Sequence, residues 1–149
     1  MQSYVGYGFN VNDLQSKDWL AVMHDHDPDE YACFVKDTIE SEGNENLDEN
    51  LLTDVEDRIA GISSLADYLR DIINDAEHEK AGTGYIVSAY DSYLVFDSVR
   101  FADDSPRTEY IRSADDFIEM ISRYVPIEAL KFGNLYEGSD WIDPCYYLE

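Results

Sequence analysis

The sequence predicts a small α+β domain in which an antiparallel sheet packs with four to five helices. Apolar residues recur at helical spacing through most of residues 16–81, and β-branched and aromatic runs lie before and after that block. The 149 residues match the size of one domain. A hydrophobic fraction of 44% and an aromatic fraction of 13% exceed what a disordered acidic chain contains. We therefore expect residues 1–149 to form a single acidic α+β domain.

Residues 4–11 predict the N-terminal strand of the sheet. Apolar residues alternate there with small or polar ones, which places on one face Val5, Tyr7, Phe9 and Val11. Gly6 and Gly8 lie on the other face. Because glycine has no side chain, another element can approach this face closely.

Two helices of the first half begin with capping signals. Asp27 is expected to cap a helix whose first residue is Pro28, and Glu30 completes a capping-box pattern. Ser64 is expected to cap a later helix, with Asp67 three residues further on. Both starts precede apolar residues at helical spacing, so we expect a helix at each.

Two further helices are expected in the same block. One starts at Ser16, and its inward side contains Trp19, Val22 and Met23. The other covers about 48–60, and its inward side contains Leu51, Val55, Ile59 and Ile62.

The second half of the sequence predicts the remaining strands. Residues 85–90 and 93–100 are β-branched and aromatic runs, and the residues 91–92 between them predict a central hairpin. A helix is expected from Ser113, and its apolar positions are Phe117, Ile118, Ile121 and Tyr124. The aromatic tail at 131–148 predicts one or two short edge strands.

Acidic residues concentrate in residues 12–57, where fifteen Asp or Glu are balanced by two Lys. This region carries more than half of the formal net charge of -23. Like charges three or four residues apart on a helix lie about 5–6 Å apart and repel. A row of helical carboxylates therefore resembles the phosphates of a duplex, which present one charge per ~1.7 Å of axis. Eight outward-facing carboxylates are expected to bind the partner: Asp29, Asp37, Glu40, Glu49, Glu56, Asp57, Asp67 and Asp71.

The charge also restricts the class of partner. Solubility of a small domain needs a net charge of only about 2–8. Direct binding of nucleic acid requires a basic surface, and anionic membranes repel an acidic protein. We therefore expect the partner to be a basic surface on another protein. Adaptation of the whole proteome to high salt and an incidental acidic surface are the alternatives.

Candidate residues for catalysis and metal binding are few. The run at 24–30 contains two His and several carboxylates, but it lacks the central glycine of a calcium loop. A capped helix start preceded by exposed histidines also accounts for it. No nucleophile elbow, phosphate loop or zinc-hydrolase motif occurs. We expect no enzymatic activity, no bound metal and no cofactor.

The expected compartment is the cytoplasm. The first residues lack the basic region and apolar run of a secretory signal, and no stretch approaches the roughly 20 apolar residues of a membrane helix. Cys33 and Cys145 are distant in sequence and have no paired metal spacing. Reduced thiols are the expected state, with a single disulfide as the alternative.

In charge, size, compartment and lack of catalytic motifs, the chain resembles the acidic nucleic-acid-mimic inhibitors of phages and mobile elements. These include anti-CRISPR and anti-restriction proteins, and acidic immunity proteins against nuclease toxins follow the same physical logic. The resemblance implies a protein of the host cytoplasm that occupies the DNA- or RNA-binding cleft of a nuclease, such as a CRISPR effector. An acidic accessory or scaffold domain that binds other proteins is the alternative.

Overall fold

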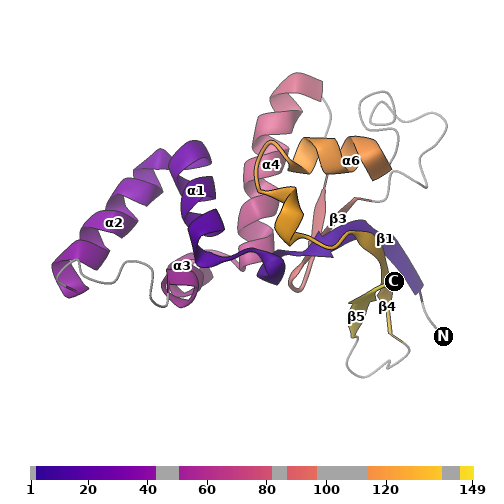
Figure 1. Ribbon diagram of the computed structural model, residues 1–149, viewed down its shortest axis with the longest axis horizontal. Coiled ribbons are helices and arrows are strands. Elements are labelled where there is room, and N and C mark those ends of the chain that lie inside the picture. The colour runs from indigo at the N-terminus through magenta and orange to yellow at the C-terminus, as the bar shows by residue number, and fades with distance from the viewer. Residues whose placement is uncertain (1–2, 43–50, 82–86, 97–113, 139–144) are drawn as a thin grey trace.

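The computed structural model describes residues 3–42, 51–81, 87–96, 114–138 and 145–149 and has an α+β fold (Figure 1). This confirms the predicted fold class, with a sheet formed by the N-terminal strand, a central hairpin and C-terminal strands. The elements in chain order are β1 (Ser3–Asn10), η1 (Val11–Asp13), α1 (Ser16–His26), α2 (Pro28–Glu42), α3 (Leu51–Ala60), α4 (Leu65–Ala81), β2 (Ser88–Tyr90), β3 (Tyr93–Phe96), α6 (Ala114–Ile121), η3 (Ile127–Ala129), β4 (Gly133–Glu137) and β5 (Tyr146–Leu148).

The five strands form one antiparallel sheet in the order β2-β3-β1-β4-β5. Its central strand is therefore β1, in which Tyr7 pairs with Phe96 of β3 on one side and with Asn134 of β4 on the other. The predicted hairpin between β2 and β3 is confirmed, and its turn holds Asp91 at a φ of 50°. Asp adopts this left-handed conformation more readily than most residues.

One face of the sheet is covered by α4 and α6 (Figure 1). Phe117 of α6 is fully buried on this face, and four aromatic rings surround it within 4.5–6.4 Å: those of Tyr7, Phe9, Phe96 and Phe132. The alternation predicted for 4–11 is confirmed from Tyr7 onward, because Tyr7 packs against this core and Phe9 and Val11 are fully buried in it, whereas a register shift interrupts the strand between Tyr4 and Gly6. Ile118, which was also predicted to face inward, is half-buried.

The opposite face of the sheet is its concave side. Gly8 lies on it, and a Cβ there would stand 2.0 Å from the carbonyl oxygen of Leu94. The close approach predicted at the glycines therefore comes from the neighbouring strand β3. The ring centroids of Tyr90 on β2 and Tyr146 on β5 lie 5.8 Å apart, which shows that these two edge strands bend toward each other. Glycine on the inner face permits this curvature.

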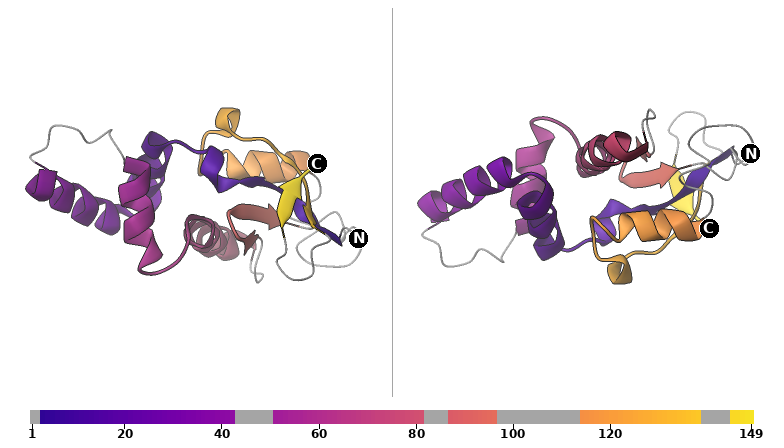
Figure 2. Two further views of the ribbon diagram at one scale, coloured as in Figure 1. Left: turned by 90° about the horizontal axis from the view of Figure 1, so that it is seen from below. Right: turned by 90° about the horizontal axis from the view of Figure 1, so that it is seen from above.

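The helices α1, α2 and α3 form a lobe that projects from the sheet (Figures 1 and 2). We call them the helical lobe. Trp19, Met23, Phe34 and Val55 are buried inside it. The same hydrophobic cluster continues into α4 through Leu69, so the lobe and the sheet share one core.

Two local predictions are wrong. Glu30 does not complete a capping box, because its carboxylate binds Arg58 while the N–H of Asp27 donates to the carbonyl of Met23 at 2.8 Å. Ile62 does not face inward; it is 82% exposed because α3 ends at Ala60, before the turn that contains it.

The predicted cap at Ser64 is confirmed, since its Oγ accepts from the N–H of Asp67 at 3.2 Å. The helix start predicted at about residue 48, Glu49 and the cap at Ser113 lie outside the described residues.

Candidate partner-binding surface

Of the predicted partner-binding carboxylates, those within the described residues lie on three helices. Asp29, Glu56, Asp57 and Asp71 are exposed, as expected from their helical spacing, and Asp67 is half-buried. Asp37 and Glu40 lie on α2, but their side chains are outside the part of the chain that the structure describes.

The described arginines are all paired with carboxylates. Arg58 binds Glu30, and Arg123 binds the fully buried Glu77 at 3.0 Å. Arg70 lies 2.9 Å from Asp67 and 3.1 Å from Asp71, so these two predicted site residues are partly neutralised.

Three of the predicted carboxylates are exposed at the surface and have no basic partner in the described part of the chain. Within the described ranges, no basic side chain forms an ion pair with Asp29, Glu56 or Asp57. Exposed carboxylates of this kind attract cations through water over about one Debye length, ~8 Å at physiological salt. The helical lobe therefore presents uncompensated negative charge on α2 and α3.

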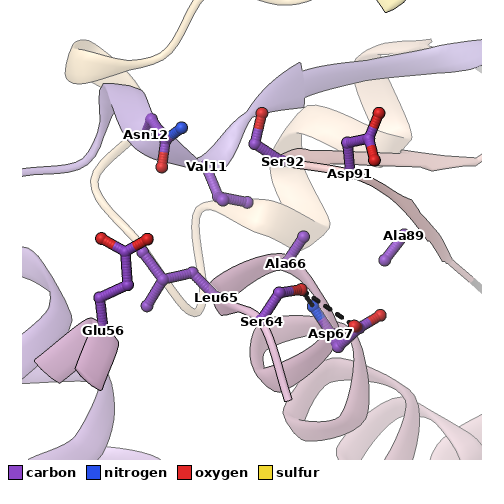
Figure 3. Close-up of a pocket in the computed structure, with 10 residues that line it drawn as sticks. All are labelled: Val11, Asn12, Glu56, Ser64, Leu65, Ala66, Asp67, Ala89, Asp91 and Ser92. Atoms are coloured by element: carbon purple, nitrogen blue, oxygen red, sulfur yellow. Dashed lines mark hydrogen bonds between the residues drawn. The ribbon is translucent and has the colours of Figure 1, made fainter. Parts of the chain in front are cut away.

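A pocket of about 420 Å³ lies where the helical lobe meets the sheet (Figure 3). Three acidic residues from separate elements line it: Glu56 of α3, Asp67 in the first turn of α4, and Asp91 in the β2–β3 turn. We call it the acidic pocket. Its other lining residues are Val11, Asn12, Ser64, Leu65, Ala66, Ala89 and Ser92.

Local hydrogen bonds hold the walls of the acidic pocket in place. The hydroxyl of Ser64 donates to the Asp67 carboxylate at 2.9 Å and accepts from its N–H, which fixes Asp67 at the start of α4 (Figure 3). The N–H of Val11 donates to the carbonyl of Ser92 at 2.8 Å, which ties the hairpin turn to the residues after β1. Asp91 was not predicted as a site residue, because nothing in its local sequence indicates that the turn lies beside α4.

Of the three carboxylates that line the acidic pocket, Asp67 is paired with Arg70, whereas Glu56 and Asp91 have no ion-pair partner among the described residues. Such a site favours a cationic group, and the ammonium of Lys or the guanidinium of Arg would form charge-assisted hydrogen bonds there. Within the described residues, no three His, Cys, Asp or Glu side chains are arranged to hold a metal ion.

The histidines of the run at 24–30 contact aromatic rings. The ring centroid of His24 lies 4.9 Å from that of Tyr31, and His26 lies 4.9 Å from Tyr124. Nδ1 of His24 also lies 2.9 Å from the Asp25 carboxylate. These contacts account for the positions of both histidines at the end of α1. Cys33 and Cys145 are exposed free thiols.

Comparison of the chain with protein-family models, with curated proteins and with solved structures finds no match. Among the described helices, none combines the length and the apolar character that crossing a lipid bilayer requires.

Proposed function

We propose that the protein is an inhibitor that binds the basic nucleic-acid-binding surface of a nuclease, such as a CRISPR effector, in place of DNA or RNA. The observation that carries this proposal is the imbalance of charge on the helical lobe. Asp29, Glu56 and Asp57 are exposed without a basic partner among the described residues, while the described arginines are paired with carboxylates.

The position of the lobe supports the same proposal. It projects from the sheet, so its acidic helices are accessible to the cleft of a partner (Figure 2). Complementary charge accelerates the encounter of two proteins and excludes partners of like charge. A nuclease that reads phosphates with Lys and Arg offers the complementary surface.

The test measures displacement of nucleic acid. A guide-loaded CRISPR effector nuclease and a restriction nuclease are each incubated with labelled duplex, and fluorescence anisotropy and cleavage are followed as the protein is added. We expect the protein to release the duplex from its target and to inhibit cleavage, with weaker inhibition at higher salt because screening slows association.

A matched pair of double variants makes the test specific to the lobe. Asp29→Lys with Asp57→Lys should abolish inhibition. The control, Asp115→Lys with Glu119→Lys, should retain inhibition. It makes the same change of charge at two exposed positions, one of them in the first turn of a helix like Asp29, but both positions lie on α6, outside the helical lobe. Equal loss from both pairs would indicate non-specific charge, and full activity of the first pair would contradict the proposal. Binding to a nuclease that keeps its nucleic acid would indicate an accessory or scaffold protein instead.

A further inference from the structure

The strand β2 forms one edge of the sheet, and its outward backbone groups are identified by the hydrogen-bond pattern. In antiparallel pairs, alternate residues bond to opposite neighbours. The N–H of Val11 donates to the carbonyl of Ser92, so within β3 Leu94 bonds toward β1 and Tyr93 bonds toward β2. Ala89 faces Leu94 in the register, so the N–H and C=O of Ala89 point to the outer edge of the sheet.

Asn74 of α4 confirms this alternation independently. Val87, two residues before Ala89, donates its N–H to Oδ1 of Asn74 at 3.0 Å and accepts from Nδ2 at 3.1 Å. The buried amide of Asn74 thus takes the place of a neighbouring strand at Val87. Ala89 is the next outward-pointing residue, and no group within the described ranges bonds its outward N–H or C=O.

There is open space beside this edge. Ala89 lines the acidic pocket, and it also lines a second pocket of about 330 Å³ formed with Arg70, Val87, Ser88 and Tyr90. Figure 3 shows Ala89 between Asp91 and Asp67 at one end of the acidic pocket, with Glu56 at the other end. A chain that runs along β2 would therefore pass through both pockets.

We propose that the outer edge of β2 binds an extended segment of the partner as a sixth strand, and that a Lys or Arg of this segment enters the acidic pocket. The inference rests on the proposed function in one respect, that the partner is basic. Hydrogen bonds between the backbone of the segment and the outward N–H and C=O of Ala89 supply affinity that does not depend on the segment's sequence, as in other cases of strand addition to a sheet edge. Glu56 and Asp91, which have no ion-pair partner among the described residues, supply the preference for a cation.

The edge is tested with a peptide of seven alternating Thr and Val residues that has one central Lys. The whole protein, labelled with ¹⁵N, is titrated with this peptide, and amide shifts and hydrogen exchange are recorded. We expect the Ala89 amide to shift and its exchange to slow at least tenfold at saturation. The same peptide N-methylated at its three central residues should not bind, and replacing its Lys by Glu should weaken binding at least tenfold.

Variants test each contact separately. Ala89→Pro removes only an outward N–H, which an edge strand tolerates, and should abolish binding. Asp91→Asn should weaken binding of the Lys peptide several-fold, whereas Asp115→Asn on α6 should have no effect. If Ala89→Pro does not fold, the N-methylated peptide still tests the same hydrogen bonds.

Three results would overturn the proposal: no change at Ala89 with about 1 mM peptide, equal binding of the Glu peptide, or protection of Ala89 that depends on protein concentration without peptide. The last result would indicate that a second copy of the chain pairs with β2. Failure of this test leaves the displacement of nucleic acid by the helical lobe intact, because that experiment varies Asp29 and Asp57, which do not line either pocket.

Discussion

The hydroxyl of Tyr68 on α4 donates a 2.8 Å hydrogen bond to the carboxylate of Asp27, at the corner between α1 and α2. This bond joins the helical lobe to the helix that covers the sheet. Burial of the phenol, its hydrogen bond to Asp27 and the charges of Asp27 and Glu30 raise the pKa of Tyr68 far above its usual value. The hydroxyl therefore stays protonated and keeps donating wherever the fold is stable.

Removing this hydroxyl should destabilise the protein. We expect Tyr68→Phe to lower the free energy of unfolding by about 1.5–3 kcal/mol, the range for hydrogen bonds to charged groups. Urea unfolding followed by circular dichroism measures the change. Tyr31→Phe is the control, since Tyr31 is also half-buried and contacts His24 through its ring. It should change stability by less than about 0.5 kcal/mol. Equal effects of the two substitutions would contradict a role for the Asp27 contact.

The raised pKa of Tyr68 also predicts how stability depends on alkaline pH. Folding favours the neutral phenol, so this contribution is fully present below the unfolded pKa of about 10 and is lost as pH rises above it. Tyr7, Tyr146 and Tyr147 also have pKa values raised chiefly by burial and act in the same direction. Unfolding of the wild type at pH about 9 and about 11 should show a loss of stability. The loss should be smaller in Tyr68→Phe, and an equal loss would refute the assignment.

The ion pair of Glu77 with Arg123 is buried on the carboxylate side only. Glu77 is fully buried and accepts from the hydroxyl of Tyr124 at 2.7 Å as well as from Arg123. Glu77→Ala removes the acceptor of both hydrogen bonds, one of which comes from the buried hydroxyl of Tyr124, so we expect it to lower the free energy of unfolding by about 1–3 kcal/mol. Asp75→Ala, an exposed position on the same helix, should change it by less than about 0.5 kcal/mol. Similar melting temperatures for the two variants would contradict this account.

Local patterns in the sequence were sufficient for the elements of this fold. Alternation in β1 from Tyr7 onward, the two-residue turn of the hairpin and the cap at Ser64 each depend on residues close in the chain, and all three are confirmed. The contact between Gln15 and Asp18 at the start of α1, where the N–H of Gln15 donates to the Asp18 carboxylate at 2.9 Å, is equally local, but Gln is not among the residues preferred at an N-cap.

The burial of polar residues against partners that are distant in the sequence could not be predicted from local patterns. Asn74 and Glu77 look like residues of an exposed helix face, yet both are buried because α4 lies against β2 and the residues that follow α6. The acidic pocket has the same origin. Its three carboxylates come from α3, α4 and a hairpin turn, and only the tertiary packing brings Asp91 to the other two.

Gly8 and Gly61 provide a matched test of the curved sheet. A Cβ at Gly8 would clash with the Leu94 carbonyl at 2.0 Å, so Gly8→Ala should destabilise the protein by about 1–3 kcal/mol or more. At Gly61 the nearest atom, the Arg58 carbonyl oxygen, is 3.6 Å away. Gly61→Ala should therefore be neutral or should stabilise by up to about 1 kcal/mol through the unfolded state. Thermal unfolding compares the two, and a tolerated Gly8→Ala would show that the sheet is less tightly curved in solution.

Repulsion among the exposed carboxylates predicts a dependence of stability on salt. The net charge of -23 opposes compact folding, and salt screens charges beyond about 10 Å at 0.1 M. Raising NaCl from about 10 mM to about 500 mM should therefore increase the melting temperature. A melting temperature that stays constant or falls as NaCl is raised would contradict the idea that repulsion among exposed carboxylates destabilises the fold. Unfolding in the absence of molar salt would identify the charge as an adaptation to a saline host.

The central place of β1 has a consequence for synthesis of the chain. This strand leaves the ribosome before every other described element, yet its neighbours β3 and β4 are encoded far downstream. Until β4 emerges, one side of β1 exposes unpaired N–H and C=O groups, a state that favours pairing with other chains. Contacts between segments so distant in sequence also form slowly. Translation that stops before Gly133 would therefore release a nascent chain with the middle of its sheet open, which a cell would have to hold on a chaperone or degrade.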